Sequence, residues 1–95
     1  MTLYEEVKSA LRIKTNDEGI KSEIDTLIEA SRADLTSSGI EDDETNKLYR
    51  LAIVTFCKAN FGFDNPDFDR FNKSYELVKH KLMNVTEYRS SGDSI

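Results

Sequence analysis

Apolar residues recur at helical spacing in four stretches of the chain, and polar or glycine-containing segments separate these stretches. The first stretch opens on Thr2 and Glu5, whose spacing is that of a capping box at a helix N-terminus. Its apolar residues, at intervals of four, three and one, are Leu3, Val7, Ala10 and Leu11. The pattern predicts a first helix over about residues 3–13.

A second stripe of mostly apolar residues predicts a second helix. It consists of Ile20, Ile24, Leu27, Ile28, Ser31 and Leu35. Thr15 and Glu18 repeat the capping-box spacing just before the stripe, so we expect the helix to begin there. We expect it to end at Ser38 and Gly39, because glycine readily adopts the left-handed conformation of a C-terminal cap.

The third stretch, residues 48–61, is apolar in nearly every direction of a helical wheel. Its β-branched residues would also suit a strand. However, no helix breaker occurs between Asp43 and Gly62, and this uninterrupted segment is too long for a typical strand. We therefore predict a central helix covered by its neighbours. The acidic cluster Glu41–Glu44 precedes it, where we expect carboxylates to favour the helix N-terminus rather than to bind a cation.

A turn and a fourth helix follow. Gly62 is expected to end the third helix, Asn65 to cap the next one, and Pro66 to occupy its first position. A narrow stripe continues with Phe68, Phe71, Tyr75, Val78 and Leu82. Tyr75, in the middle of this stripe, can bury its ring and keep its hydroxyl in solvent.

Beyond Met83 the helical period is lost and serine and glycine increase. The chain of 95 residues is thus predicted to be all-α, a small bundle of about four helices. One domain covers residues 1–83, and residues 84–95 form a flexible C-terminal tail. Apolar residues make up 38% of the chain and charged residues 33%, so the core has little surplus.

Charge narrows the class of function. The net charge of −5 argues against a protein that mainly grips nucleic acid. Residues 1–44 carry 12 acidic and 5 basic residues, whereas residues 45–95 carry 6 acidic and 8 basic ones. An acidic front and a mildly basic back suit head-to-tail association of identical copies, although ordinary solvated helix faces explain the same counts.

Little in the chain supports catalysis or a bound cofactor. The single histidine, His80, lies near the predicted end of the fourth helix, where the helix dipole favours it. Asp64, Asp67 and Asp69 have the alternation of a calcium loop, but Pro66 interrupts them and the loop glycine is missing.

The single cysteine, Cys57, lies in an apolar run and is expected to be a buried thiol. No apolar stretch is long enough to cross a bilayer, and the first residues lack the features of a signal peptide. The sequence therefore predicts no catalytic, cofactor or metal site and no membrane partner, and it makes an enzyme improbable.

Residues Lys58–Asp67 read KANFGFDNPD. After them, the fourth stretch carries Phe71, Lys73, Ser74, Tyr75, Leu77, Lys79 and Leu82. This arrangement resembles the C-terminal half of the head–tail connector proteins of tailed phages, which are also called head–tail adaptors and have been described as DNA-packaging proteins. The first two predicted helices also resemble that family, so the likeness covers roughly residues 3–83.

The resemblance implies a structural virion protein whose copies form a homo-oligomeric ring, twelve-fold on the portal of a phage or prophage. Such a ring extends the DNA channel after packaging and offers a surface to the stopper or tail protein. DNA passes through it without sequence-specific binding. The implied location is the head–tail junction of the virion, with the host cytoplasm as the place of assembly.

The connector hypothesis carries expectations for individual residues. Those expected to hold the core are Leu27, Leu51, Phe56, Phe71 and Tyr75. Those expected to form the turn that sets the angle between helices three and four are Phe61, Gly62, Asn65 and Pro66. In the C-terminal tail of the chain, the residues expected to contact a partner protein are Tyr88, Arg89 and Ile95.

Other classes remain open at this point. A small acidic helical regulatory protein, of the antitoxin or inhibitor type, would bind one basic partner without forming a ring. A helix-turn-helix DNA-binding domain could use the short connection Ser37–Asp43, but its recognition helix would begin with acidic residues that repel phosphate.

Overall fold

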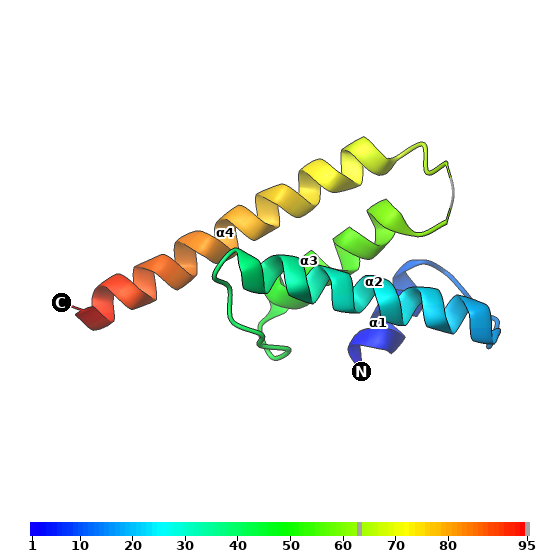
Figure 1. Ribbon diagram of the computed structural model, residues 1–95, viewed down its shortest axis with the longest axis horizontal. Helices are drawn as coiled ribbons and strands as arrows, with labels where there is room; N and C mark the ends of the chain where they lie inside the picture. Colours follow the sequence, from blue (N-terminus) through cyan, green and yellow to red (C-terminus); the bar gives the residue numbers. More distant parts are fainter. Residues whose placement is uncertain (63, 95) are drawn as a thin grey trace.

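The computed structural model describes the backbone of residues 1–62 and 64–94 and the side chains of residues 1–62 and 64–84. Over these residues the chain consists of helices and connections without strands. The helices are α1 (Leu3–Ala10), α2 (Glu18–Ser37), α3 (Lys47–Asn60) and α4 (Phe68–Ser94), arranged as in Figure 1. The prediction of an all-α bundle of about four helices is confirmed.

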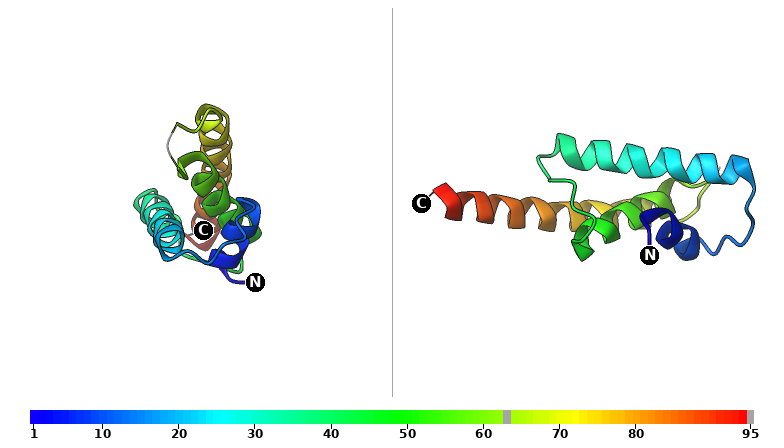
Figure 2. Two further views of the ribbon diagram at one scale, coloured as in Figure 1. Left: turned by 90° about the vertical axis from the view of Figure 1, so that its right-hand side faces the viewer. Right: turned by 90° about the horizontal axis from the view of Figure 1, so that it is seen from below.

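Helix α3 is the centre of the bundle, as predicted, because it packs against each of the other three helices (Figure 2). Its buried residues are Tyr49, Ala52, Ile53, Val54, Thr55, Cys57 and Ala59. The Thr55 hydroxyl donates to the Leu51 carbonyl at 2.7 Å, so this buried polar group is satisfied within the helix. Burial raises the pKa of the Cys57 thiol to about 12, which keeps it protonated.

The caps of the first two helices differ from each other. At α1 the predicted capping box is present, since the Thr2 and Glu5 backbone N–H groups each donate to the other residue's side chain, at 2.9 and 3.1 Å. At α2 the predicted box of Thr15 and Glu18 is wrong. Asp17 is the N-cap, and its carboxylate accepts from the N–H groups of Gly19 at 2.8 Å and Ile20 at 3.1 Å. A carboxylate is the stronger acceptor for these groups, which explains its preference over the hydroxyl.

The C-terminal ends of α1 and α2 follow from backbone geometry. Helix α1 ends at Ala10 rather than at residue 13, because Arg12 has a φ of 60° and interrupts the helix. Helix α2 buries Ile24, Ile28, Ser31 and Leu35 along the predicted stripe. It ends as predicted, with Gly39 at a φ of 85°.

The acidic cluster lies in the connection before α3 and not in its first turn. Asn46 is the N-cap of α3, and its side-chain oxygen accepts from the Leu48 N–H at 2.8 Å. The expectation that the carboxylates stabilise this helix end is therefore wrong. Arg32 on α2 instead binds Asp42 at 2.7 Å and Glu44 at 2.9 Å.

The turn between α3 and α4 is organised by one side chain. The Asn65 amide donates to the carbonyls of Lys58, at 2.6 Å, and Ala59, at 3.1 Å, at the end of α3. Its oxygen accepts from the Asp67 N–H at 2.9 Å. Helix α4 begins at Phe68, two residues later than predicted, because Pro66 and Asp67 form a tight turn closed by the Phe68 N–H and the Asn65 carbonyl.

Gly62 occupies the left-handed region with a φ of 79°, and a Cβ placed there would meet no neighbouring atom within 4 Å. Any cost of substitution is therefore backbone strain rather than a clash. We expect Gly62→Val to lower the free energy of unfolding by about 1–2 kcal/mol, since β-branched residues resist this region. Urea denaturation measures the change, with Gly62→Asn as the matched control that tolerates positive φ. Equal stability of the glycine and valine chains would contradict a structural need for this conformation.

The residues expected to form the core are not equally buried. Tyr75 is 2% exposed, while Leu27, Phe56 and Phe71 are half-buried. The expectation for Leu51 is wrong, because its side chain is 47% exposed. It lies about 200° around α3 from the buried Ile53, at about 100° per residue, on a side that the neighbouring helices leave open.

The tail predicted over residues 84–95 lies mostly outside the residues whose side chains the structure describes. Helix α4 continues to Ser94 in Figure 1. The side chains of the predicted tail, apart from Asn84, lie outside the described residues, and so do the proposed partner contacts Tyr88, Arg89 and Ile95.

Candidate functional site

A polar network fastens α4 to the rest of the bundle. The Tyr75 hydroxyl on α4 donates to the Asp34 carboxylate on α2, and the Lys79 ammonium lies 3.0 Å from the same oxygen. The Tyr75 ring meets the Phe56 ring on α3 edge to face, with centroids 5.2 Å apart. One turn of α4 is thereby tied to both α2 and α3.

The contacts of this network shift the pKa values of Asp34 and Tyr75. The pKa of Asp34 is lowered, mainly by the hydrogen bond from Tyr75 and also by the hydrogen bond and charge of Lys79. Burial and the hydrogen bond to the carboxylate raise the pKa of Tyr75, so its hydroxyl stays protonated. The expectation that this hydroxyl faces solvent is wrong, because it donates to a residue 41 positions away in the sequence.

The network predicts a loss of stability in acid. Because the folded-state pKa of Asp34 lies below its ordinary value of 3.8, its contribution is fully present above that value and disappears as the pH falls through the folded-state pKa. We expect the melting temperature to fall between about pH 5 and about pH 2, and to fall less steeply in Asp34→Asn. Circular dichroism melts of both chains measure this difference. Identical slopes would remove Asp34 from the account.

The outer side of α4 carries an exposed stripe. We call Arg70, Lys73, Leu77, His80 and Lys81 the α4 stripe. Because each residue turns the helix by about 100°, these five positions share about 100° of its circumference, and no acidic residue among the described positions lies in that sector. All five side chains are exposed, and Leu77, at 66%, contrasts with the buried Leu82 on the inner side.

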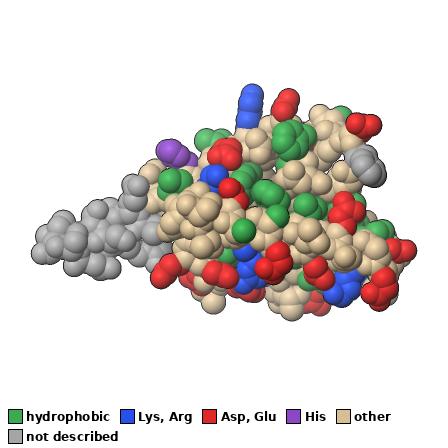
Figure 3. Space-filling view, viewed as in Figure 1, with side chains coloured by type: hydrophobic (Ala, Val, Ile, Leu, Met, Phe, Trp, Pro, Cys, Tyr) green, Lys and Arg blue, Asp and Glu red, His purple; other side chains and the backbone are tan. Residues whose placement is uncertain are grey.

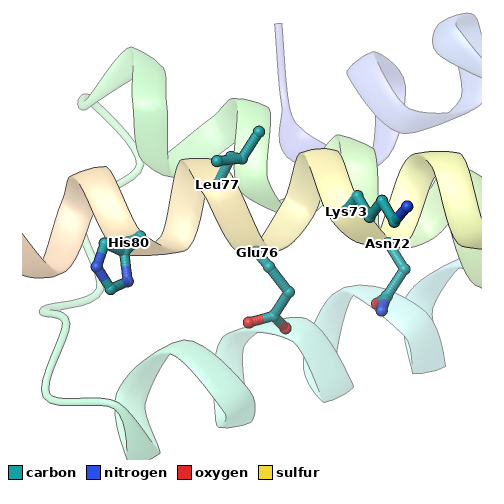
Figure 4. A pocket seen from close by; sticks show the side chains of 5 residues that line it. All are labelled: Asn72, Lys73, Glu76, Leu77 and His80. Carbon is teal, nitrogen blue, oxygen red and sulfur yellow. The ribbon is translucent and has the colours of Figure 1, made fainter.

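A shallow groove of about 470 Å³ runs along part of this stripe. It is lined by Asn72, Lys73, Glu76, Leu77 and His80. Leu77 and Glu76 point to opposite sides of the helix in Figure 4, so the apolar side chain is separated from the carboxylate. Since an exposed leucine among bases forms no part of the bundle core, this groove is the candidate contact site for another molecule.

The opposite charge gathers on another helix. Glu18, Asp25 and Glu29 share the outer side of α2, at intervals of seven and four residues, and we call them the α2 face. Acidic side chains gather over α2 in Figure 3. Lys21 pairs with Asp25 at 2.8 Å, at the edge of this face. The charge asymmetry of the sequence thus corresponds to two separate surfaces of one folded chain.

The reactive side chains are not brought together. His80 is exposed on the α4 stripe, in the interior of a helix that runs to Ser94 rather than near its end as expected, whereas Cys57 is buried in α3. Within residues 1–62 and 64–84, His, Cys, Asp and Glu side chains form no cluster of three or more that could hold a metal. No helix in the described part of the chain is long and apolar enough to cross a membrane.

Comparison with known proteins decides the family. A family model described as phage connector protein matches residues 3–89. The chain belongs to the phage connector protein family. The match includes α1, α2, α3 and most of α4, so it covers the whole described core together with the α4 stripe. Neither a curated protein nor a solved structure matches the chain.

Family membership gives this phage connector protein a structural role as a component of the virion. The resemblance read from the sequence is confirmed as a family assignment.

Sequence reasoning missed the residue that joins the N-terminal segment of the connector fold to α3. Arg50 on α3 donates to the Glu6 carboxylate at 2.7 Å, to the Met1 carbonyl at 2.6 Å and to the Glu44 carbonyl at 3.2 Å. The available signal was an arginine at the start of the most apolar helix, where a cation needs partners. Its partners could not be named, because they lie at distant positions in the sequence.

Proposed function

We propose that copies of this chain form a ring beneath the portal that extends the DNA channel and joins the capsid to the tail after packaging. The observation that carries the proposal is the family match over residues 3–89. The two charged surfaces support it, because they differ and lie on different helices. A contact between unlike surfaces of identical copies generates a closed ring when the rotation between neighbours closes.

The partners in this proposal are the portal protein on one side of the ring and a stopper or tail protein on the other. DNA passes through the channel without sequence-specific binding, and the net charge of −5 favours passage of a polyanion without adhesion. Residues 84–95, with Tyr88, Arg89 and Ile95, contact the portal or the neighbouring copy.

The direct test is electron microscopy of phage lysates in which this gene is interrupted and then complemented. We expect separate tails and tailless heads from the interrupted gene, some of the heads having lost their DNA, and normal virions after complementation. Normal virions without the gene would contradict the connector role. Capture of a single partner at equal stoichiometry would then favour the small regulatory binding protein.

The proposed contact made by residues 84–95 is tested by truncating the chain after Met83. Leu82 is the last buried residue of the described part, so the shortened chain keeps the whole described core. We expect a cooperative melt close to that of the full chain and weaker binding to purified portal. A chain with residues 84–95 in scrambled order controls for length and composition. Unchanged portal binding by the truncated chain would contradict a tail contact.

A further inference from the structure

We propose that the α4 stripe of one copy docks along the α2 face of the next copy in the ring. This contact rests on the proposed function and names the surfaces that join neighbouring copies. The partner is a second copy of this chain because each copy carries both charges on two separate helices. Complementary potentials of this kind set the register of a contact and suppress wrong partners.

The two surfaces match in length. Arg70 and Lys81 are eleven residues apart on α4, and Glu18 and Glu29 are eleven residues apart on α2. At 1.5 Å per residue, each charged row is roughly 16 Å long. Two helices lying side by side can therefore bring each end of one row close to an end of the other.

Ion pairing inside the chain leaves these rows available. Within the described residues, Lys73 and Lys81 make no ion pair, and neither do Glu18 and Glu29. Lysines and arginines that face inward are already paired; Lys79, for example, lies 3.0 Å from Asp34. Charges without an ion pair therefore remain on each of the two outer surfaces.

The middle of the contact places an exposed apolar side chain opposite a small one. Leu77 is exposed between the bases of the α4 stripe and lines the groove of about 470 Å³. On the α2 face the short side chain of Ser22 lies between the carboxylates and leaves room for a leucine to approach. An apolar centre with a charged rim is the usual anatomy of a protein interface.

Charge reversal on each surface tests the contact. The stripe variant carries Lys73→Glu and Lys81→Glu, and the face variant carries Glu18→Lys and Glu29→Lys. All four positions are exposed, so circular dichroism should show folded chains. We expect each variant alone to lose ring formation, with self-association weakened at least about tenfold, and an equal mixture of the two to restore it. Restoration follows because the reversed stripe is complementary to the reversed face.

Analytical ultracentrifugation and chemical cross-linking of the full chains, with and without purified portal, measure assembly. The matched control is a chain with Lys14→Glu and Lys47→Glu, which has the same net charge as the stripe variant but keeps both surfaces. Rings formed by either reversed variant alone would overturn the proposal. So would a wild-type chain that stays monomeric on the portal, or a mixture that fails to assemble.

Complementation of the interrupted phage gene separates this proposal from the connector role itself. If the wild-type gene restores tailed virions and both reversed variants do so equally well, the proposed contact is wrong and the connector role stands. If the interrupted phage is normal, the connector role fails first. A stripe variant that still forms rings but no longer binds portal or DNA would assign the α4 stripe to that other partner and overturn the contact between copies.

Discussion

Replacing Tyr75 by alanine is expected to lower the free energy of unfolding by about 3–5 kcal/mol, the range for deleting a buried aromatic side chain. The side chain is 2% exposed, so its removal leaves a cavity between α3 and α4. It also removes the edge-to-face contact with Phe56 and the hydrogen bond to Asp34. For a domain of this size the loss consumes much of the total stability. Urea denaturation followed by circular dichroism measures it.

Two variants divide this effect into its causes. Tyr75→Phe keeps the ring and removes only the hydroxyl, so we expect a loss of about 1–2 kcal/mol. Leu77→Ala, on the exposed side of the same helix, should change stability by less than about 0.5 kcal/mol. If Tyr75→Ala were as mild as Leu77→Ala, Tyr75 would not anchor α4 to the bundle.

Replacing Arg50 by alanine is expected to cost about 2–3 kcal/mol, because hydrogen bonds to charged groups are the stronger ones and its removal leaves a carboxylate without its partner. The side chain is 18% exposed and is held by the Glu6 carboxylate and by the carbonyls of Met1 and Glu44. It therefore joins three segments of the chain to α3. Partial exposure of the Glu6 side chain places the estimate below that for a fully buried pair.

The control for Arg50 is another arginine of the same chain. Arg70 is 70% exposed and lies 3.6 Å from Asp67, so Arg70→Ala should cost less than about 0.5 kcal/mol. Arg50→Lys keeps the charge but lacks the fork that reaches three acceptors, and it should recover only part of the loss. Thermal melts of the three variants rank these effects. Equal losses at positions 50 and 70 would contradict a joining role for Arg50.

The proposed contact between copies depends on how α4 is anchored to the bundle. The Asp34, Tyr75 and Lys79 contacts hold the inner side of this helix, and that places the α4 stripe outward and away from α2 of its own copy. We expect a weaker anchor to change the angle at which α4 presents the stripe. A variant such as Tyr75→Phe should therefore form fewer rings than its modest loss of stability alone predicts.

Local signals in the sequence identified the helices well. Periodic apolar residues placed all four, and the spacing of Thr2 and Glu5 correctly predicted the capping box of α1. Gly39 was correctly expected in the left-handed region. Each of these features depends on residues within one or two turns, and such neighbours are already determined by the chain.

The wrong predictions arose where the sequence allowed two arrangements, either of local hydrogen bonds or of packing between helices. Asp17 caps α2 in place of Thr15, and α4 begins after Pro66 rather than at it. Leu51 belongs to an apolar run, but only the packing of the neighbouring helices leaves its side of α3 exposed. In these cases small differences in hydrogen bonding or packing select the outcome.

The sequence by itself determined the helical class, most helix positions and the resemblance to the connector family, because these depend on periodicity and on short spans of residues. Only the tertiary structure decided which charges face one another. The Arg50 contacts with Glu6 and Met1, and the Tyr75 contact with Asp34, join residues 41 to 49 positions apart. No spacing rule encodes such pairs, since they form only after α3 has brought the other helices together. The same packing pairs the inward charges and leaves the α4 stripe and the α2 face at the surface.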